Sequence, residues 1–333
     1  MCSEVKYRRE VLRNILTSDP RTRVQLECIN TPVTNNTILG DQQRNLICDR
    51  LAKGDWDILL TSSPDWLGSV NGRPVAELAR LKNKFIVYDL SDNWENSDLS
   101  IKLMRMSNFV GTSSRYLAEL AEKNCPRVGF YPNGVRLLST VEKNEESDDF
   151  KTDAKYVYCG RLAKLDLLAL DKLLALDPQE KVDIYGVDYP ILGELYRKYI
   201  NSRVRIFDRI SYEQLQKRLG LYQIGLVFFC NYEKTRYGML PDKYFDYCYA
   251  GLPTIYTNCA ELEHDDFKKT AFNLNDSSFK LNQIKVEPEE LKTVCNQYNM
   301  RNSLKKFVND MISFYYDENK AEPLDRTWTP PWK

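Results

Sequence analysis

The chain has 333 residues, which is too long for one ordinary hydrophobic core and suits two domains of roughly 150 residues each. Hydrophobic residues make up 43% of the chain and charged residues 28%, as in a folded globular protein and unlike a disordered one. The 47 basic residues equal the 47 acidic residues, which excludes attraction of the whole molecule to nucleic acid; no nucleic-acid partner is expected, although a local basic patch stays open.

The nine cysteines are odd in number and form no CxxC pair, and several lie inside apolar runs. This pattern is typical of reduced thiols, so we expect a cytoplasmic protein. The single histidine, His264, and the lack of clustered ligands argue against a zinc site. No apolar stretch approaches the roughly 18 residues of a membrane span, and the charged, helical N-terminus is not a secretory signal.

In chain order, the sequence opens on a basic helical segment and then alternates short apolar runs with helical periodicity. A Rossmann domain normally begins on its central strand, so either residues 1–5 supply a vestigial strand or that strand is absent. The strands expected in the first half are Val24–Ile29, Asp57–Thr61, Phe85–Tyr88, Phe109–Thr112 and Val128–Tyr131. The helices expected there are Tyr7–Thr17, Gln42–Lys53, Pro74–Leu81 and Ser113–Lys123.

The second half repeats this alternation. Its expected strands are Tyr156–Cys159, Val182–Tyr185, Val204–Phe207, Ile224–Phe229 and Thr254–Thr257. Its expected helices are Asp166–Leu176, Leu192–Tyr199, Tyr212–Leu219, Asp242–Ala250 and Leu304–Tyr316. Strand–helix alternation predicts an α/β fold with two parallel sheets covered by helices on both faces. The expected parts are a Rossmann-like domain over 1–139, an acidic linker over 140–154, a second Rossmann-like domain over 155–310, and a helix end with a tail over 311–333.

Residues 236–258, RYGMLPDKYFDYCYAGLPTIYTN, carry the strongest chemical signal. The helix Asp242–Ala250 begins directly after a loop, so its first N–H groups and its dipole suit a diphosphate. Lys243 adds a positive charge in the first turn. Asp246 lies three residues further, on nearly the same face, and can accept hydrogen bonds from ribose hydroxyls. In the competing interpretation, the two side chains form an ordinary solvated ion pair.

The segment PDKYFDYCYAGLP resembles the P-x-K-x-[FY]-[ED]-Y-x-A-x-G-x-P block of GT-B glycosyltransferases related to family 4. The resemblance implies that Asp246 holds the donor ribose and that Lys243 faces the diphosphate. Many family members carry a sugar-contacting glutamate eight residues before the ribose carboxylate. Gly238 stands at that position here, followed by Met239 and Leu240 in the predicted donor site. The sequence therefore leaves the identity of the donor sugar open.

Further blocks, in the family's order, are FVGTSSRYLAEL (109–120), YPNGV (131–135), YVYCGRL (156–162), VDIYGV (182–187) and VRIFDRISYEQL (204–215). The resemblance therefore spans most of residues 85–258. It implies that Gly160 lets the donor approach the chain and that Arg161 pairs with phosphate oxygens. The loop Asp208–Ser211, with Arg209 and Ile210, is where the base rests in the family.

The segment VYDLSDNWE (Val87–Glu95) is expected on the acceptor side, with Asp89, Asp92 and Asn93 as site residues. Asp92 resembles the aspartate of a Y-D-x-x-D block and could act as a general base or contact the sugar. Alternatively, Asp89 and Asp92 are turn and N-cap residues. The Asp55-Trp56-Asp57 triplet superficially looks like a metal-holding DxD motif, but a solvated strand entry is favoured.

The resemblance implies two domains facing a cleft, with the C-terminal helix crossing back to the first domain and Trp328 and Trp332 packing there. It implies a hexosyltransferase with Arg161, Lys243 and Asp92 as catalytic candidates, no cofactor and no metal. We expect GDP-mannose as donor, retention of configuration, and a glycan, lipid-linked or protein-linked acceptor. A catalytically silent nucleotide-sugar-binding protein and a sugar-nucleotide epimerase are the alternatives.

The basic opening helix leaves peripheral contact with a membrane open, through Lys6, Arg8, Arg9 and Arg13. An ordinary helix that buries one face is the favoured interpretation of this segment. Assembly into a homodimer also stays open.

Overall fold

The computed structural model describes residues 3–18, 57–62, 69–70, 73–74, 84–90, 98–136, 150–186, 203–232 and 237–320, with positions 193, 195 and 197–199. The chain divides into two compact units. The first unit comprises Met1–Thr112, Ala118–Tyr131 and Leu304–Lys333. The second unit comprises Ser113–Leu117 and Pro132–Ser303.

The first unit is built on a parallel sheet with the strand order β1-β4-β5-β6. These strands are β1 (Ile58–Thr61), β4 (Phe85–Leu90), β5 (Phe109–Thr112) and β6 (Val128–Phe130). Every residue of β4 and β5 is buried, as expected for parallel strands covered on both faces. A separate antiparallel pair joins β2 (Ser69–Val70) to β3 (Arg73–Pro74).

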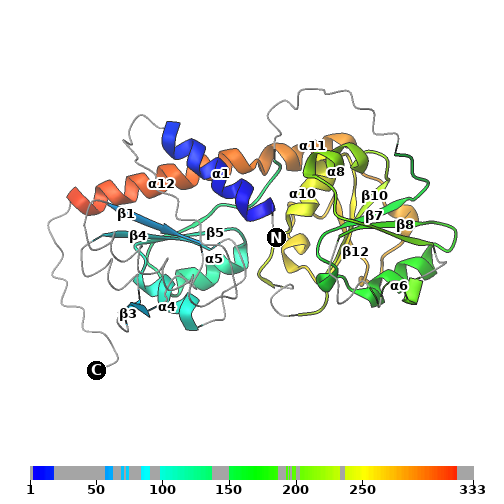
Figure 1. The fold of residues 1–333 in the computed structure, drawn as a ribbon, viewed down its shortest axis with the longest axis horizontal. Coiled ribbons are helices and arrows are strands. Elements are labelled where there is room, and N and C mark those ends of the chain that lie inside the picture. Colours follow the sequence, from blue (N-terminus) through cyan, green and yellow to red (C-terminus); the bar gives the residue numbers. More distant parts are fainter. Residues whose placement is uncertain are drawn as a thin grey trace. The chain divides into compact units, whose positions relative to one another are not determined.

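Helices flank this sheet on both sides. Figure 1 shows α4 (Asp98–Met106) and α5 (Arg115–Glu122) on one face, and α1 (Ser3–Ser18) and α12 (Met300–Lys320) on the other. The Phe307 ring of α12 stacks on Phe109 of β5, with ring centroids 5.5 Å apart. The expected return of the final helix to the first domain is therefore confirmed. Trp328 and Trp332 lie outside the described residues.

Helix α1 is the predicted basic helix, and one of its faces is buried. Leu12, Ile15 and Leu16 are buried, while Arg13 is exposed. Residues 3–5 are already helical, so they supply no strand to the sheet. Among the helices that the structure describes, none is long and apolar enough to cross a membrane.

The second unit contains a six-stranded parallel sheet with the order β12-β11-β10-β7-β8-β9. Its strands are β7 (Tyr156–Cys159), β8 (Val182–Tyr185), β9 (Val204–Phe207), β10 (Ile224–Phe228), β11 (Thr254–Thr257) and β12 (Ala271–Asn273). Numbered from β7, this is the 3-2-1-4-5-6 order of the doubly wound Rossmann fold. The winding reverses between β7 and β10, which is where such sheets bind ligands.

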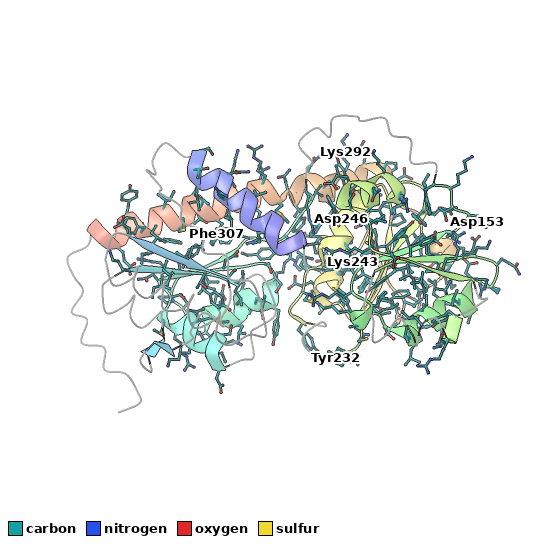
Figure 2. The ribbon with its side chains drawn as sticks, in the orientation of Figure 1. Asp153, Tyr232, Lys243, Asp246, Lys292 and Phe307 are labelled. Carbon is teal, nitrogen blue, oxygen red and sulfur yellow. The ribbon has the colours of Figure 1, made fainter. Side chains whose placement is uncertain are left out.

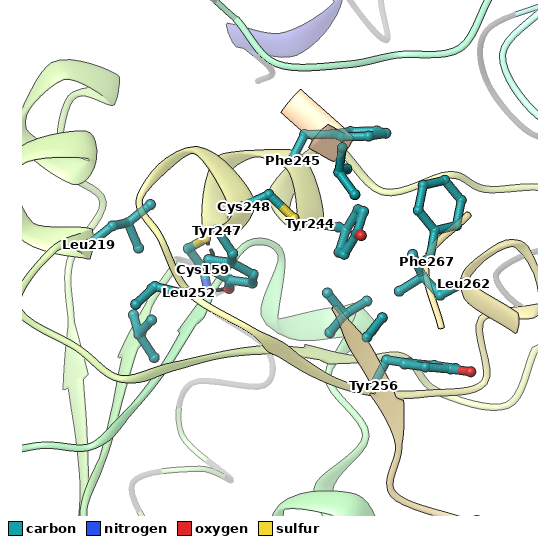
Figure 3. Close-up of a cluster of buried hydrophobic side chains, with 14 of the residues drawn as sticks. Cys159, Leu219, Tyr244, Phe245, Tyr247, Cys248, Leu252, Tyr256, Leu262 and Phe267 are labelled. Carbon is teal, nitrogen blue, oxygen red and sulfur yellow. Dashed lines mark hydrogen bonds between the residues drawn. The ribbon is translucent and has the colours of Figure 1, made fainter. Parts of the chain in front are cut away.

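Alternate side chains of these strands face two hydrophobic clusters. Val157 and Cys159 face the cluster under α8 (Tyr212–Leu219), α10 (Asp242–Tyr249) and α11 (Pro288–Gln297), which Figure 3 shows around α10. Tyr156 and Tyr158 face the opposite cluster, with α6 (Leu167–Leu176). Each face of the sheet therefore has its own layer of helices, as a doubly wound sheet requires.

The packing of α10 on the sheet is close. A Cβ at Gly225 in β10 would lie 2.3 Å from the Tyr247 ring, so this strand position needs glycine. The Tyr247 hydroxyl accepts from the Cys159 backbone N–H at 3.0 Å and donates to the Leu226 carbonyl at 3.2 Å. One buried tyrosine thereby ties α10 to both β7 and β10.

Several expectations need correction or lie out of reach. The second sheet has six strands, not five, because the three-residue β12 is too short to show a pattern. Helices α4 and α11 were not expected. Pro74 belongs to β3 and not to a helix. Three expected segments lie outside the described residues: Val24–Ile29, Gln42–Lys53 and residues 75–81. The expected helix Leu192–Tyr199 is helical at the positions that the structure describes.

Candidate functional site

Three of the predicted donor residues, Gly160, Arg161 and Lys243, lie at the carboxyl ends of β7 and β10, which we call the switch-point edge. Gly160 follows β7 directly and has a φ of +146°, which residues with a side chain rarely adopt. A Cβ at this position would lie 2.7 Å from Nζ of Lys243. The backbone angle therefore requires glycine, and a side chain here would also displace the lysine ammonium. Arg161, the next residue, is exposed at the same edge.

Aromatic rings hold Lys243 at this edge. Its Nζ lies 4.0 Å from the centroid of the Tyr158 ring and 5.1 Å from that of Phe229. Such contacts attract an ammonium to the ring face. Figure 2 shows Lys243 and Asp246 on α10. The lysine is thus positioned by the ends of two neighbouring strands, β7 and β10, although it belongs to a helix.

The start of α10 favours an anion. Pro241 is the N-cap and provides no side-chain hydrogen bond to the first turn. The negative charge of Asp242 in that turn is balanced by Arg136, whose Nη2 lies 3.0 Å from Oδ2. The helix dipole and the Lys243 ammonium therefore dominate the electrostatics of this helix start.

Asp246 lies one turn further along α10 and is 7% exposed. The Tyr212 hydroxyl donates to its Oδ1 at 2.6 Å. Burial raises the pKa of Tyr212 well above its usual value, and the neighbouring Asp246 carboxylate raises it further. The phenol therefore stays protonated and remains a hydrogen-bond donor to the carboxylate.

Three loops at the switch-point edge are tied together by Asp166 and Asn258. Asp166 caps α6 by accepting from the backbone N–H groups of Leu168 at 3.0 Å and Ala169 at 3.2 Å. The Asn258 amide donates to Asp166 Oδ2 at 3.2 Å and to the Phe229 carbonyl at 2.7 Å. The segments after β7, β10 and β11 thus form one hydrogen-bonded surface. The sequence analysis did not identify this role for Asp166 or Asn258.

Lys164 is a basic side chain that the sequence analysis also missed. It ends the 3-10 helix η2 (Leu162–Lys164), and its Nζ lies 3.4 Å from the Met239 sulfur. It adds an ammonium between the loop after β7 and the loop before α10. The sequence could have indicated Lys164 as a site residue, because it follows Arg161 by three positions and ends a tight turn.

The other predicted donor residues fall into two groups. Arg209 is exposed and Ile210 is half-buried, in the loop between β9 and α8. Gly238 is buried, and the Leu240 side chain is 3% exposed and packs into the core under α10. Leu240 therefore contributes its backbone position to the site, and its side chain to the core.

On the predicted acceptor side, Asp89 is buried in β4 within the first unit. Arg8 donates to both of its carboxylate oxygens, from Nε to Oδ2 at 3.0 Å and from Nη2 to Oδ1 at 2.8 Å. The same ion pair removes Arg8 from the basic surface of α1. Asp92 and Asn93 lie outside the described residues. The residues that the structure describes contain no group of three metal-binding side chains.

No protein-family profile and no curated protein sequence matches the chain. Solved structures do match it. A mutant O-GlcNAc transferase of Thermobaculum terrenum aligns over 96% of this chain and 67% of its own, with a TM-score of 0.60 and 13% identity. The lipopolysaccharide galactosyltransferase WaaB aligns over 84% of this chain and 82% of its own, with a TM-score of 0.59 and 14% identity.

The glycosyltransferase WaaG, which acts in lipopolysaccharide biosynthesis, aligns over 94% of both chains, with a TM-score of 0.52 and 11% identity. This protein has the GT-B fold. The predicted fold class is confirmed. In the GT-B fold of this chain, the switch-point edge belongs to the second of the two Rossmann-like units.

Proposed function

We propose that this chain is a glycosyltransferase that binds a nucleotide-diphosphate sugar at the switch-point edge of its second unit. The observation that carries the proposal is the position of Lys243. Its ammonium lies against Gly160 at the end of β7, in the first turn of the helix that also carries Asp246. A basic group, a helix start and a carboxylate one turn away match the order of diphosphate and ribose in a nucleotide sugar.

The chemistry follows from these groups. Lys243, Arg161 and the start of α10 face the diphosphate, and Asp246 accepts hydrogen bonds from the ribose hydroxyls. In the transfer step, the bond between the anomeric carbon and the diphosphate oxygen breaks, and an acceptor hydroxyl oxygen bonds to that carbon. The hydroxyl proton passes to the departing phosphate, as suits retention of configuration. Fixed positive charge at the diphosphate stabilises the leaving group.

The resemblance to family 4 supports GDP-mannose as the first donor to try, because mannosyl transfer is frequent among its members. The acceptor is proposed to be a glycan, lipid-linked or protein-linked. Lys164 adds to the positive charge that Arg161 and Lys243 supply, in keeping with metal-independent transfer. Turnover that is unchanged by a chelator is the expected result.

Isothermal titration with a panel of nucleotide sugars and nucleoside diphosphates tests the donor site. We expect the nucleotides of one base to bind with micromolar affinity, and the sugar phosphate alone not to bind. If no nucleoside diphosphate binds at millimolar concentration, the proposed donor site is wrong.

A catalytically silent binding protein is the second candidate, and Gly238 favours it. The family glutamate that contacts the sugar is replaced there by a buried glycine. Release of nucleoside diphosphate in the presence of candidate acceptors separates the two. Binding without acceptor-dependent release would assign the chain to the silent class, whereas release supports transfer.

A further inference from the structure

Four side chains of the second unit form a string of successive contacts: Asp246, Tyr212, Arg136 and Asp242. The Tyr212 hydroxyl donates to Asp246 at 2.6 Å, and the Arg136 guanidinium lies 4.8 Å from the centroid of the Tyr212 ring. Arg136 in turn pairs with Asp242 at 3.0 Å. The string therefore leaves α10 at Asp242 and returns to it one turn later at Asp246.

Tyr212 itself is placed by a capping box at the start of α8. The Ser211 hydroxyl accepts from the Gln214 N–H at 3.1 Å, and the Gln214 side chain accepts from the Ser211 N–H at 3.1 Å. This reciprocal pair fixes the backbone of the first turn. Tyr212 is the first residue of this helix, so the capping box fixes its backbone while the Arg136 guanidinium lies against its ring.

We propose that Tyr212 is the positioning residue for the carboxylate that binds the donor ribose, an inference that rests on the proposed function. An aspartate side chain turns about two bonds, and a donor fixed at Oδ1 selects one orientation of the carboxylate plane. The hydroxyl that performs this selection comes from α8, directly after the loop Asp208–Ser211 expected to hold the base. Ribose affinity therefore depends on a residue that need not contact the ribose.

The test uses Tyr212→Phe and compares two ligands. One is the nucleoside diphosphate that binds the parent protein, and the other is its 2′,3′-dideoxy analogue. We expect the variant to bind the ribose ligand about tenfold more weakly, since a carboxylate that is no longer held in one orientation must be ordered when the ribose binds. The dideoxy ligand should change by less than about twofold, because it has no hydroxyl for the carboxylate to receive. In turnover, KM for the donor should rise about tenfold while kcat stays within about twofold.

Tyr222→Phe is the matched control. The Tyr222 hydroxyl donates to the buried carboxylate of Asp183 at 2.9 Å, on the same sheet and outside the switch-point edge. This variant removes the same kind of hydrogen bond, together with the one that joins Tyr222 to the Tyr185 hydroxyl at 2.8 Å, and should lower the urea midpoint without changing the affinity for either ligand. It shows what a purely structural tyrosine does in this unit.

The outcomes separate the inference from the proposed function. If the parent binds neither ligand, the proposed function and the inference both fail. If the parent prefers the ribose ligand and Tyr212→Phe keeps that preference, the inference alone fails. If Tyr212→Phe weakens both ligands equally, Tyr212 only supports the fold, and the inference again fails. Loss of the ribose preference in Tyr212→Phe and in Asp246→Asn, but not in Tyr222→Phe, supports it.

Discussion

Two buried carboxylates, one in each unit, are held in different ways. Asp89 in β4 is 3% exposed, and Asp246 in α10 is 7% exposed. Arg8 donates to both oxygens of Asp89, whereas the Tyr212 hydroxyl donates to Oδ1 of Asp246. Both carboxylates lie in Rossmann-like units, Asp89 in a strand of the first parallel sheet and Asp246 in a helix that packs on the second. What separates them is the chemistry of the partner.

A guanidinium balances the charge of a carboxylate and matches its geometry with two parallel hydrogen bonds. A phenol donates one hydrogen bond and brings no charge. The first arrangement makes Asp89 an anchor for α1, and the second orients Asp246 through a hydroxyl from α8. The partner type therefore distinguishes a structural carboxylate from one suited to receive hydroxyl groups, and the following experiments test that distinction.

Replacing Arg8 should have the largest effect. Arg8→Met leaves the Asp89 carboxylate buried without its countercharge, so the free energy of unfolding should fall by about 3–5 kcal/mol. Urea denaturation measures this. The double variant Arg8→Met with Asp89→Leu should recover most of the loss, because an apolar pair can replace a buried ion pair. A double variant as unstable as the single one would show that Arg8 acts through other contacts.

Replacing Asp246 should affect binding more than stability. In the proposed donor site, Asp246→Ala would remove charge-assisted hydrogen bonds to the ribose, so nucleoside diphosphate affinity should fall by about one to three decades. The free energy of unfolding should change by less than about 2 kcal/mol, the cost of leaving the Tyr212 hydroxyl unpaired. Titration calorimetry and urea denaturation give the two values. A folded variant with the parent's affinity would remove Asp246 from the site.

Replacing Lys243 should weaken diphosphate binding by about tenfold and also slow transfer, because its charge stabilises the leaving group. Lys243→Met is compared with Lys155→Met, which removes the same charge beside the opposite end of β7, where Lys155 pairs with Asp177. Donor titration and initial rates are the measurements. Equal losses in the two variants would mean that only the net charge of the unit matters. The free nucleoside should bind Lys243→Met as tightly as it binds the parent.

Asp266 sharpens the comparison because it has both kinds of partner, the hydroxyl of Tyr298 and the guanidinium of Arg115. The Tyr298 hydrogen bond lowers the pKa of Asp266 below its ordinary value of 3.8, with smaller contributions from nearby charges. A carboxylate with a lowered pKa stabilises the folded protein at pH values above its ordinary pKa. This stabilisation is lost as the pH falls through the pKa of the folded state.

The parent should therefore exceed Asp266→Asn in unfolding free energy by up to about 1 kcal/mol at pH 5 to 7, and this difference should shrink towards pH 3. Urea denaturation at three pH values tests it. Burial raises the pKa of neighbouring Glu261, but that group titrates in both proteins and largely cancels. A difference that grows in acid would contradict the assigned direction.

The sequence predicted the second sheet well, for a physical reason. Strands β7, β8, β9 and β11 have the expected bounds because apolar, aromatic or β-branched residues hold at least three of the four positions in each. Helix α10 was equally visible, since Pro241 precedes it and Gly251, with a φ of +81°, follows it. These signals are local and need no knowledge of what lies across the fold.

The partners of the site residues could not be predicted in the same way. Tyr212 and Asp246 are 34 positions apart, and Asp166 and Asn258 are 92 apart. Periodicity assigns each residue to a helix, strand or loop, but it does not say which side chains meet when strands adopt the order 3-2-1-4-5-6. The Arg8–Asp89 pair was missed for this reason: Asp89 was expected in the acceptor site or a turn, and Arg8 was considered only for contact with a membrane.

The central position of β7 has a consequence for protein synthesis. β7 leaves the ribosome before the other strands of its sheet, and β8 can pair with it on one side, followed by β9 on β8, as they emerge. Its other edge must wait for β10, whose first residue is Ile224. During that interval an unpaired strand edge is exposed and can join another chain. A nucleotide cannot protect such nascent chains, because α10, which carries Lys243 and Asp246, follows β10 and has not yet packed on the sheet.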